Sequence, residues 1–151
     1  MELAGLIDLV FPVACAGCGA AGAPFCKRCE PPAGAAVTFA VGPIACAAVG
    51  PYAGTLRAAI LGLKAGRRDV ADALAALIVA RLRTRFAAAA VLVGVPTTGN
   101  RRRERGFDQG PLLARSIARR LCMPSLDALA CRDAGAQHER GRRERLAAAG
   151  R

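Results

Sequence analysis

Apolar residues recur at helical spacing in three parts of this chain. Across residues 55–64, 69–86 and 109–121 they fall three and four positions apart, which is the spacing of the buried face of an amphipathic helix. The sequence therefore predicts a helix over each range. Arginines near the end of the second range, of which Arg81 is the first, are interpreted as cations favoured by a helix dipole. Residues that commonly cap a helix stand at or just before the start of the ranges: Thr55, Asp69 and Asp108.

Between the second and third predicted helices, Val91–Val95 is a short continuous apolar stretch. Such a stretch predicts a strand buried on both faces, as in a parallel sheet. Residues 30–50 are rich in proline and glycine, and we expect a connection there with one or two short strands. Residues 96–107 predict a long loop. The order helix, helix, strand, loop, helix is typical of an α/β domain.

The cysteines carry the most specific chemical signal. Two Cys-x-x-Cys pairs are separated by seven residues, and they comprise Cys15, Cys18, Cys26 and Cys29. Paired cysteines at this spacing are typical of a structural zinc site, in which four thiolates surround the ion at about 2.3 Å and leave no open position. We therefore expect the four sulfur atoms to lie within about 4 Å of one another.

Redox-active pairs and an iron–sulfur cluster remain as alternatives for these four cysteines. Disulfides would require export, and the opening of the chain lacks the features of a signal peptide, because Glu2 and Asp8 interrupt it. The other cysteines, Cys46, Cys122 and Cys131, are scattered along the chain. We interpret them as small buried hydrophobic residues.

The composition adds a strong basic charge to this picture. The 151 residues are 54% hydrophobic and carry a formal net charge of +11, with the whole surplus after residue 50. Such a surplus favours phosphate-bearing partners, in nucleic acid or in a small substrate. Aromatic residues make up only 4%, so base-stacking platforms for single strands are scarce. No apolar stretch of the sequence is long enough for a membrane span, and we expect a cytoplasmic protein of one domain.

The predicted loop at 96–107 is the candidate for phosphate binding, because it follows a predicted strand and loops of this length are often functional. Arginines can bind a phosphate with two hydrogen bonds, and small polar residues expose backbone N–H groups to it. The proposed phosphate site comprises Thr97, Thr98, Gly99 and Asn100, with Arg101 and Arg105 as charged walls. Arg102 and Arg103 are interpreted as facing solvent or a polyanion. A nucleic-acid backbone patch and a solvated basic turn are the alternatives.

Taken in order, these motifs resemble the ComF family. The paired cysteines are followed by YAGTLRAAILGLKAGRRDVADALA, by VPTTGNRRRERGFDQGPLLARSIARRL and by the arginine-rich QHERGRRERL. RERGFDQ is the most specific string, and Asp108 stands where family members have Asn. The resemblance implies an α/β fold, with a small zinc ribbon ahead of an incomplete type I phosphoribosyltransferase-like domain that has a Rossmann-like parallel sheet. We expect a zinc-ribbon segment at 1–35, a connection at 36–50 and the front part of the transferase-like domain at 51–151.

For function, the resemblance implies a phosphoribosyltransferase-like protein with structural zinc, linked to DNA uptake in competence. Its implied ligand is phosphoribosyl pyrophosphate or another phosphorylated small molecule, with Mg²⁺ accompanying the ligand where the complete domain is present. Type I phosphoribosyltransferases hold the ribose and its 5-phosphate with an acidic pair and a Thr-Thr-Gly in a later strand and loop. That element does not follow in this sequence, so we assign no catalytic residue and expect no transferase activity from this chain alone.

The alternative function is a basic, zinc-containing binding module that contacts single-stranded DNA or a competence helicase. The stretch Gln137–Arg145 resembles the flexible loop that closes over the substrate in this enzyme class, and we expect it to be mobile. It contains His138, the only histidine, which we expect to be solvated.

Overall fold

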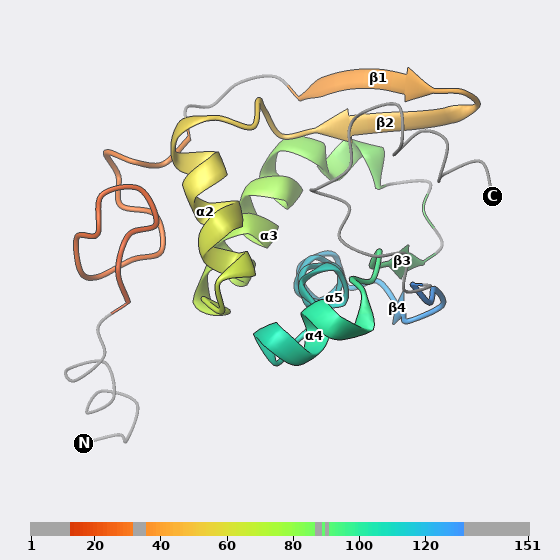
Figure 1. The fold of residues 1–151 in the computed structure, drawn as a ribbon. Coiled ribbons are helices and arrows are strands. Elements are labelled where there is room, and N and C mark those ends of the chain that lie inside the picture. The colour runs from red at the N-terminus through yellow and green to blue at the C-terminus, as the bar shows by residue number, and fades with distance from the viewer. Residues whose placement is uncertain (1–12, 32–35, 87–88, 90, 132–151) are drawn as a thin grey trace.

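The computed structural model describes residues 13–31, 36–86, 89 and 91–131, and Figure 1 shows the fold. Residues 13–31, called here the cysteine knuckle, consist of turns with one isolated bridge. The elements that follow are β1 (Val37–Val41), β2 (Ile44–Ala48), α2 (Gly54–Lys64), α3 (Asp69–Leu82), the 3₁₀ turn η1 (Arg83–Arg85), β3 (Leu92–Val93), α4 (Gly99–Arg105), α5 (Gln109–Leu121) and β4 (Ser125–Leu126). This is a mixed α/β fold. Within the described ranges, no helix is long and apolar enough to cross a membrane. Gln137–Arg145 and His138 lie outside the described residues.

The hydrophobic core lies where α3 packs against both α2 and α5 (Figure 1). Small side chains on α2 and α3 let the helix axes approach closely. The buried residues that form the core of this pair are Leu56, Ala59, Leu63, Val70, Ala71 and Leu74. The helices predicted over 55–64, 69–86 and 109–121 are confirmed, except that α3 ends at Leu82 and passes into η1.

One of the three predicted helix caps is correct. The Asp108 carboxylate accepts a hydrogen bond, at 3.3 Å, from the backbone N–H two residues further on and so caps α5. Thr55 is not a cap, because α2 begins one residue before it. Asp69 is not a cap either, because it is already the first residue of α3. In that first turn the charge of Asp69 is favoured by the helix dipole, and it pairs with Arg67.

β1 and β2 form an antiparallel hairpin, so the prediction of one or two short strands within 30–50 is confirmed. The register places Val41 opposite Ile44 across a two-residue turn of Gly42 and Pro43. Gly42 has a φ of +57°, which suits the first central position of a type II′ turn, where glycine is preferred.

The predicted buried central strand at Val91–Val95 is wrong. β3 contains only two residues, and within the described part of the chain its one strand partner is β4, which runs parallel to it. Val93 is 38% exposed and Val95 is 75% exposed. Burial is greatest at Gly94, where a Cβ atom would lie 2.5 Å from the backbone nitrogen of Pro111. The stretch therefore passes close to the start of α5 but is not enclosed between two layers.

The predicted loop at 96–107 contains a helix, so the loop prediction is wrong over Gly99–Arg105. The Thr98 hydroxyl accepts a hydrogen bond, at 3.4 Å, from the backbone N–H of Arg101 and caps α4. Gly106, with a φ of +71°, ends the helix in the left-handed conformation that glycine commonly adopts there. The signals in the sequence are the capping residue Thr98, the run of good helix formers at 101–105 and the glycine that follows it.

Candidate metal centre

The cysteine knuckle brings the Sγ atoms of Cys15, Cys18, Cys26 and Cys29 together, all within 4.8 Å of one another. The Sγ atoms of Cys18 and Cys26 are 3.7 Å apart. Four sulfurs at 2.3 Å from one zinc ion form a tetrahedron with edges of about 3.8 Å, so the cluster is near this size and slightly wider. The predicted grouping of the four cysteines is confirmed, although the separations extend beyond the expected limit of about 4 Å.

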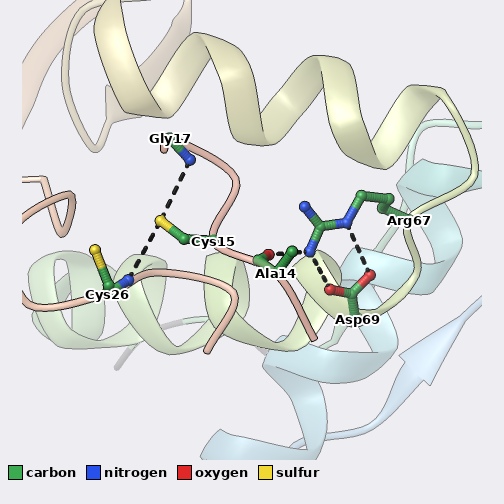
Figure 2. A network of polar contacts seen from close by, with 6 residues as sticks. All are labelled: Ala14, Cys15, Gly17, Cys26, Arg67 and Asp69. Atoms are coloured by element: carbon green, nitrogen blue, oxygen red, sulfur yellow. Dashed lines mark hydrogen bonds and ion pairs between the residues drawn. The ribbon is translucent and has the colours of Figure 1, made fainter. Parts of the chain in front are cut away.

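Backbone N–H groups hold the sulfur of Cys15 in place. Gly17 and Cys26 each donate a backbone N–H to it, both with an N–S distance of 3.4 Å (Figure 2). The first donor belongs to the same turn and the second to the other Cys-x-x-Cys turn, so this sulfur joins the two turns. Between the pairs the chain reverses through Gly19 and Gly22, whose φ angles of +76° and +114° favour glycine.

Hydrogen bonds within the cysteine knuckle shift the pKa values of Cys15 and Cys29 in opposite directions. Backbone hydrogen bonds, with that from Cys26 the most important, lower the pKa of Cys15 to about 6. Side-chain hydrogen bonds with Cys18 and Cys26 raise the pKa of Cys29 to about 12. A side-chain hydrogen bond to Cys18, followed by the charges of the nearby thiolates, raises the pKa of Arg28. Four thiols this close do not all ionise unless a cation shares their charge, and a bound metal supplies that charge.

Two arginines connect the cysteine knuckle to the helices by hydrogen bonds. Arg67, in the turn between α2 and α3, donates a hydrogen bond to the carbonyl oxygen of Ala14 (Figure 2). Arg81, in the last turn of α3, donates to the carbonyl oxygen of Pro31 at 2.8 Å and to that of Val49. Arg81 is therefore a structural link between distant segments, which the helix-dipole interpretation does not explain.

Close packing also joins the knuckle to α2. A Cβ atom on Gly17 would lie 3.0 Å from the Cβ and the Sγ of Cys29 and 3.0 Å from the Cγ2 of Thr55. Gly17 thus separates the second cysteine pair from the first turn of α2. Ala16 and Phe25 pack against the core formed by α2 and α3. The cysteine cluster and the helical core therefore share a common boundary.

The donor set fits a structural zinc ion. Thiolates are soft ligands that select zinc or iron–sulfur clusters over hard cations, and four of them fill a tetrahedral zinc site. The sequence contains seven cysteines, so three lie outside this cluster. The prediction for the other three is wrong: Cys46 is half-buried, and Cys122 and Cys131 are exposed. They lie on a surface hairpin, at the end of α5 and beyond β4, away from the buried helix faces.

A cavity of about 490 Å³ opens beside the knuckle, bordered by the hairpin and the start of α2. Its lining includes Arg28, Cys29, Val37, Val49 and Arg81. One residue of the cysteine cluster, Cys29, therefore borders this cavity.

Of the residues predicted to bind phosphate, Thr97 and Thr98 lead into α4, and Gly99 and Asn100 are its first two residues. The backbone N–H of Thr97 donates to both carboxylate oxygens of Asp108, at 3.0 and 3.2 Å. The hydroxyl of Thr98 caps α4, and Gly99 is its first residue. The N–H of Thr97 and the hydroxyl of Thr98 are therefore already engaged in hydrogen bonds at the starts of α5 and α4. The carboxylate of Asp108 lies next to this segment.

The four arginines of α4 lie on two sides of the helix, one half-buried and one exposed. Arg101 and Arg105 are four residues apart, which places them on one face of the helix, and both are half-buried. Arg105 donates a hydrogen bond to the side-chain oxygen of Gln109 at 2.9 Å. Arg102 and Arg103 are exposed. The four guanidinium groups therefore do not converge on one point.

Sequence reasoning missed the arginines that hold the knuckle on the helices. A hydrogen bond from Arg67 or Arg81 to a distant carbonyl oxygen leaves no periodic pattern in the sequence. Comparisons of the chain with protein-family models, with curated proteins and with solved structures find no match.

Proposed function

We propose that the four cysteines hold one structural zinc ion and that the chain is a zinc-ribbon protein of the ComF type. The observation that carries the zinc part of this proposal is the convergence of four Sγ atoms within 4.8 Å, and the ComF part rests on the resemblance of the sequence motifs alone. A zinc ion held by four thiolates has no open position for a substrate, so its role is to fold the knuckle. Arg67 and Arg81 extend that role to α2 and α3, because they bind carbonyl oxygens of the knuckle.

Metal analysis of the purified chain tests the zinc site. We expect about one zinc ion per chain, and Co²⁺ in its place should give the intense absorption of tetrahedral thiolate coordination. Cys18→Ser should weaken metal binding strongly. Cys46→Ser changes the same residue type outside the cluster and should leave metal binding unchanged. Full zinc affinity in Cys18→Ser, or iron with labile sulfide in the purified protein, would contradict the proposal.

For the second part of the chain we propose binding of a phosphorylated small molecule, with phosphoribosyl pyrophosphate as the ligand that the ComF resemblance implies. Support comes from Arg101 and Arg105, which lie on one face of α4. Arg101 is in its first turn, and Arg105, its last residue, donates to Gln109 at the start of α5. Asp108 opposes such a ligand, because its carboxylate occupies the N–H of Thr97 and adds negative charge there. We therefore expect weak binding, and stronger binding in Asp108→Asn.

Titration with pyrophosphate, followed by NMR, tests this site. Amide shifts should concentrate at residues 97–100 and should shrink in Arg105→Ala. Arg102→Ala removes a guanidinium group from the exposed side of α4 and should have little effect. Absent shifts, or equal losses in the two variants, would show that residues 97–100 serve only to start the helix.

The exposed side of α4 favours a second candidate, a module that binds single-stranded DNA. Arg102 and Arg103 are exposed there, in a chain whose net charge is +11. Phosphate-backbone binding weakens steeply as salt rises, and replacing both arginines by alanine should reduce the salt slope by about 2. Binding with no salt dependence, or an unchanged slope in the double variant, would exclude this candidate.

A further inference from the structure

Within the described part of the chain, the hairpin of β1 and β2 exposes an apolar face. Residues directly opposite in an antiparallel pair share a face of the sheet. The pairs on one side are Val37 with Ala48, Phe39 with Cys46, and Val41 with Ile44. These six residues are called here the hairpin face. Its four large side chains are all more than half exposed, with Val37 at 52%, Phe39 at 51%, Val41 at 59% and Ile44 at 62%.

The hairpin is neutral in a strongly basic chain. Between Glu30 and Arg57 the sequence contains no charged residue, although the net charge is +11. Edge strands of soluble proteins are usually protected by charged side chains, lysine above all, and β1 has none. Two copies of so basic a chain repel each other over most of their surfaces. The hairpin is therefore a region where two copies can approach.

β1 forms the outer edge of this two-stranded sheet. Figure 1 shows β2 on the side of the helices and β1 on the outside. The carbonyl group of Val49, just after β2, accepts a hydrogen bond from Arg81 of α3, which agrees with this order. Among the described residues, no strand pairs with the outer edge of β1. A two-stranded hairpin is marginally stable by itself, and additional strands stabilise it.

The register identifies the backbone groups on that edge. In a two-residue hairpin the pair next to the turn, here Val41 and Ile44, exchanges hydrogen bonds, and such pairs alternate with non-bonded ones along the ladder. Phe39 therefore directs its N–H and C=O toward β2, whereas Thr38 and Ala40 direct theirs to the outer edge. In the strand sequence VTFAV, Phe39 has a small residue on each side and a valine beyond each small residue. The order of large and small side chains is therefore the same in both directions from Phe39.

We propose that two copies of this chain associate through β1 in a four-stranded antiparallel sheet, with a two-fold axis at Phe39. Pairing centred there places Phe39 opposite the same residue of the second copy, in a close non-hydrogen-bonded pair. Thr38 then lies opposite Ala40, and these residues exchange the hydrogen bonds of the outer edge. A two-fold contact requires a self-complementary surface, which the symmetric strand supplies. This association is independent of the zinc and phosphate proposals.

Sedimentation of the zinc-loaded full chain, from about 1 to about 500 µM, tests the association. We expect a reversible monomer–dimer equilibrium that added salt strengthens, because salt screens the repulsion between copies. Phe39→Lys places like charges opposite each other and should weaken the dimer roughly tenfold or more. Val95→Lys introduces the same charge at an exposed apolar residue outside the hairpin, and should leave the equilibrium nearly unchanged.

A further variant distinguishes edge pairing from face-to-face packing of two hairpins. Ile44 belongs to the hairpin face but lies on β2, away from the proposed axis, so Ile44→Lys should weaken the dimer less than Phe39→Lys. Circular dichroism and zinc content show whether each variant is folded. A chain that stays monomeric throughout the range, equal effects of Phe39→Lys and Val95→Lys, or an effect of Ile44→Lys as large as that of Phe39→Lys would overturn the proposal.

Discussion

Adding one methyl group at Gly17 should loosen the candidate metal centre. A Cβ atom at this position would lie 3.0 Å from the Cβ and Sγ of Cys29 and from the Cγ2 of Thr55, whereas unstrained contacts of this kind are about 3.5–4.0 Å. Neither neighbour is free to retreat, because Cys29 belongs to the cysteine cluster and Thr55 lies in the first turn of α2. The strain should therefore act on the position of a metal ligand.

The size of the effect follows from two opposing contributions. Forcing an additional methyl group into a packed site costs about 1–3 kcal/mol. Alanine also restricts the unfolded chain relative to glycine, which offsets about 0.4–1 kcal/mol of that cost. At the midpoints of these two ranges the net loss in Gly17→Ala is about 1.3 kcal/mol, and if it falls on the folded knuckle, zinc binding weakens about tenfold.

Zinc transfer to a chromogenic chelator of known affinity measures this loss. Gly62→Ala is the matched control, because a Cβ atom there, in the last turn of α2, would meet only the Cδ of Arg67, at 3.8 Å. That substitution should raise stability by about 0.5–1 kcal/mol and leave zinc affinity unchanged. Equal zinc affinity in Gly17→Ala and the native chain would refute the described packing of the knuckle against α2.

Three further predictions concern individual contacts. Arg81→Ala should lower the free energy of unfolding by about 1–3 kcal/mol, because its hydrogen bonds to the carbonyl groups of Pro31 and Val49 are lost; an unchanged denaturant midpoint would contradict this. Asp108→Ala should cost about 1 kcal/mol through loss of the α5 cap, and Asp108→Asn, which keeps an acceptor, should cost less; equal losses in thermal unfolding would argue against capping. In the metal-free protein, folding lowers the pKa of Cys15 from 9.0 to about 6, so its thiolate contributes fully to stability above pH 9. That contribution decreases as pH falls and is lost below about pH 6, and equal hydrogen-exchange protection of the knuckle at high and low pH would contradict it.

Features set by local sequence were predictable. The spacing of Cys15, Cys18, Cys26 and Cys29 predicts their convergence, because each short turn places two sulfurs on one side. Apolar periodicity predicts the three helices. Asp108 is recognisable as a cap because aspartate is a common capping residue and it stands just before the predicted helix. These predictions need only interactions within a few residues of the chain.

Features that depend on distant neighbours were not predictable in the same way. The apolar stretch Val91–Val95 resembles a buried strand, but its burial depends on how many strands and layers surround it, and the described structure pairs it with β4 alone. Arg81 resembles a cation at a helix end until its contacts with Pro31 and Val49 are known. The helix α4 is an intermediate case, because its cap and its terminal glycine are local signals that the loop interpretation overlooked.

X-ray absorption at the zinc edge of the purified chain tests the central claim most directly. The four cysteine sulfurs converge within 4.8 Å of one another, so we expect a single shell of four sulfur atoms around zinc at about 2.3 Å. A first shell that contains nitrogen or oxygen at about 2.0–2.1 Å, or fewer than four sulfur atoms, would contradict a zinc ion held by Cys15, Cys18, Cys26 and Cys29.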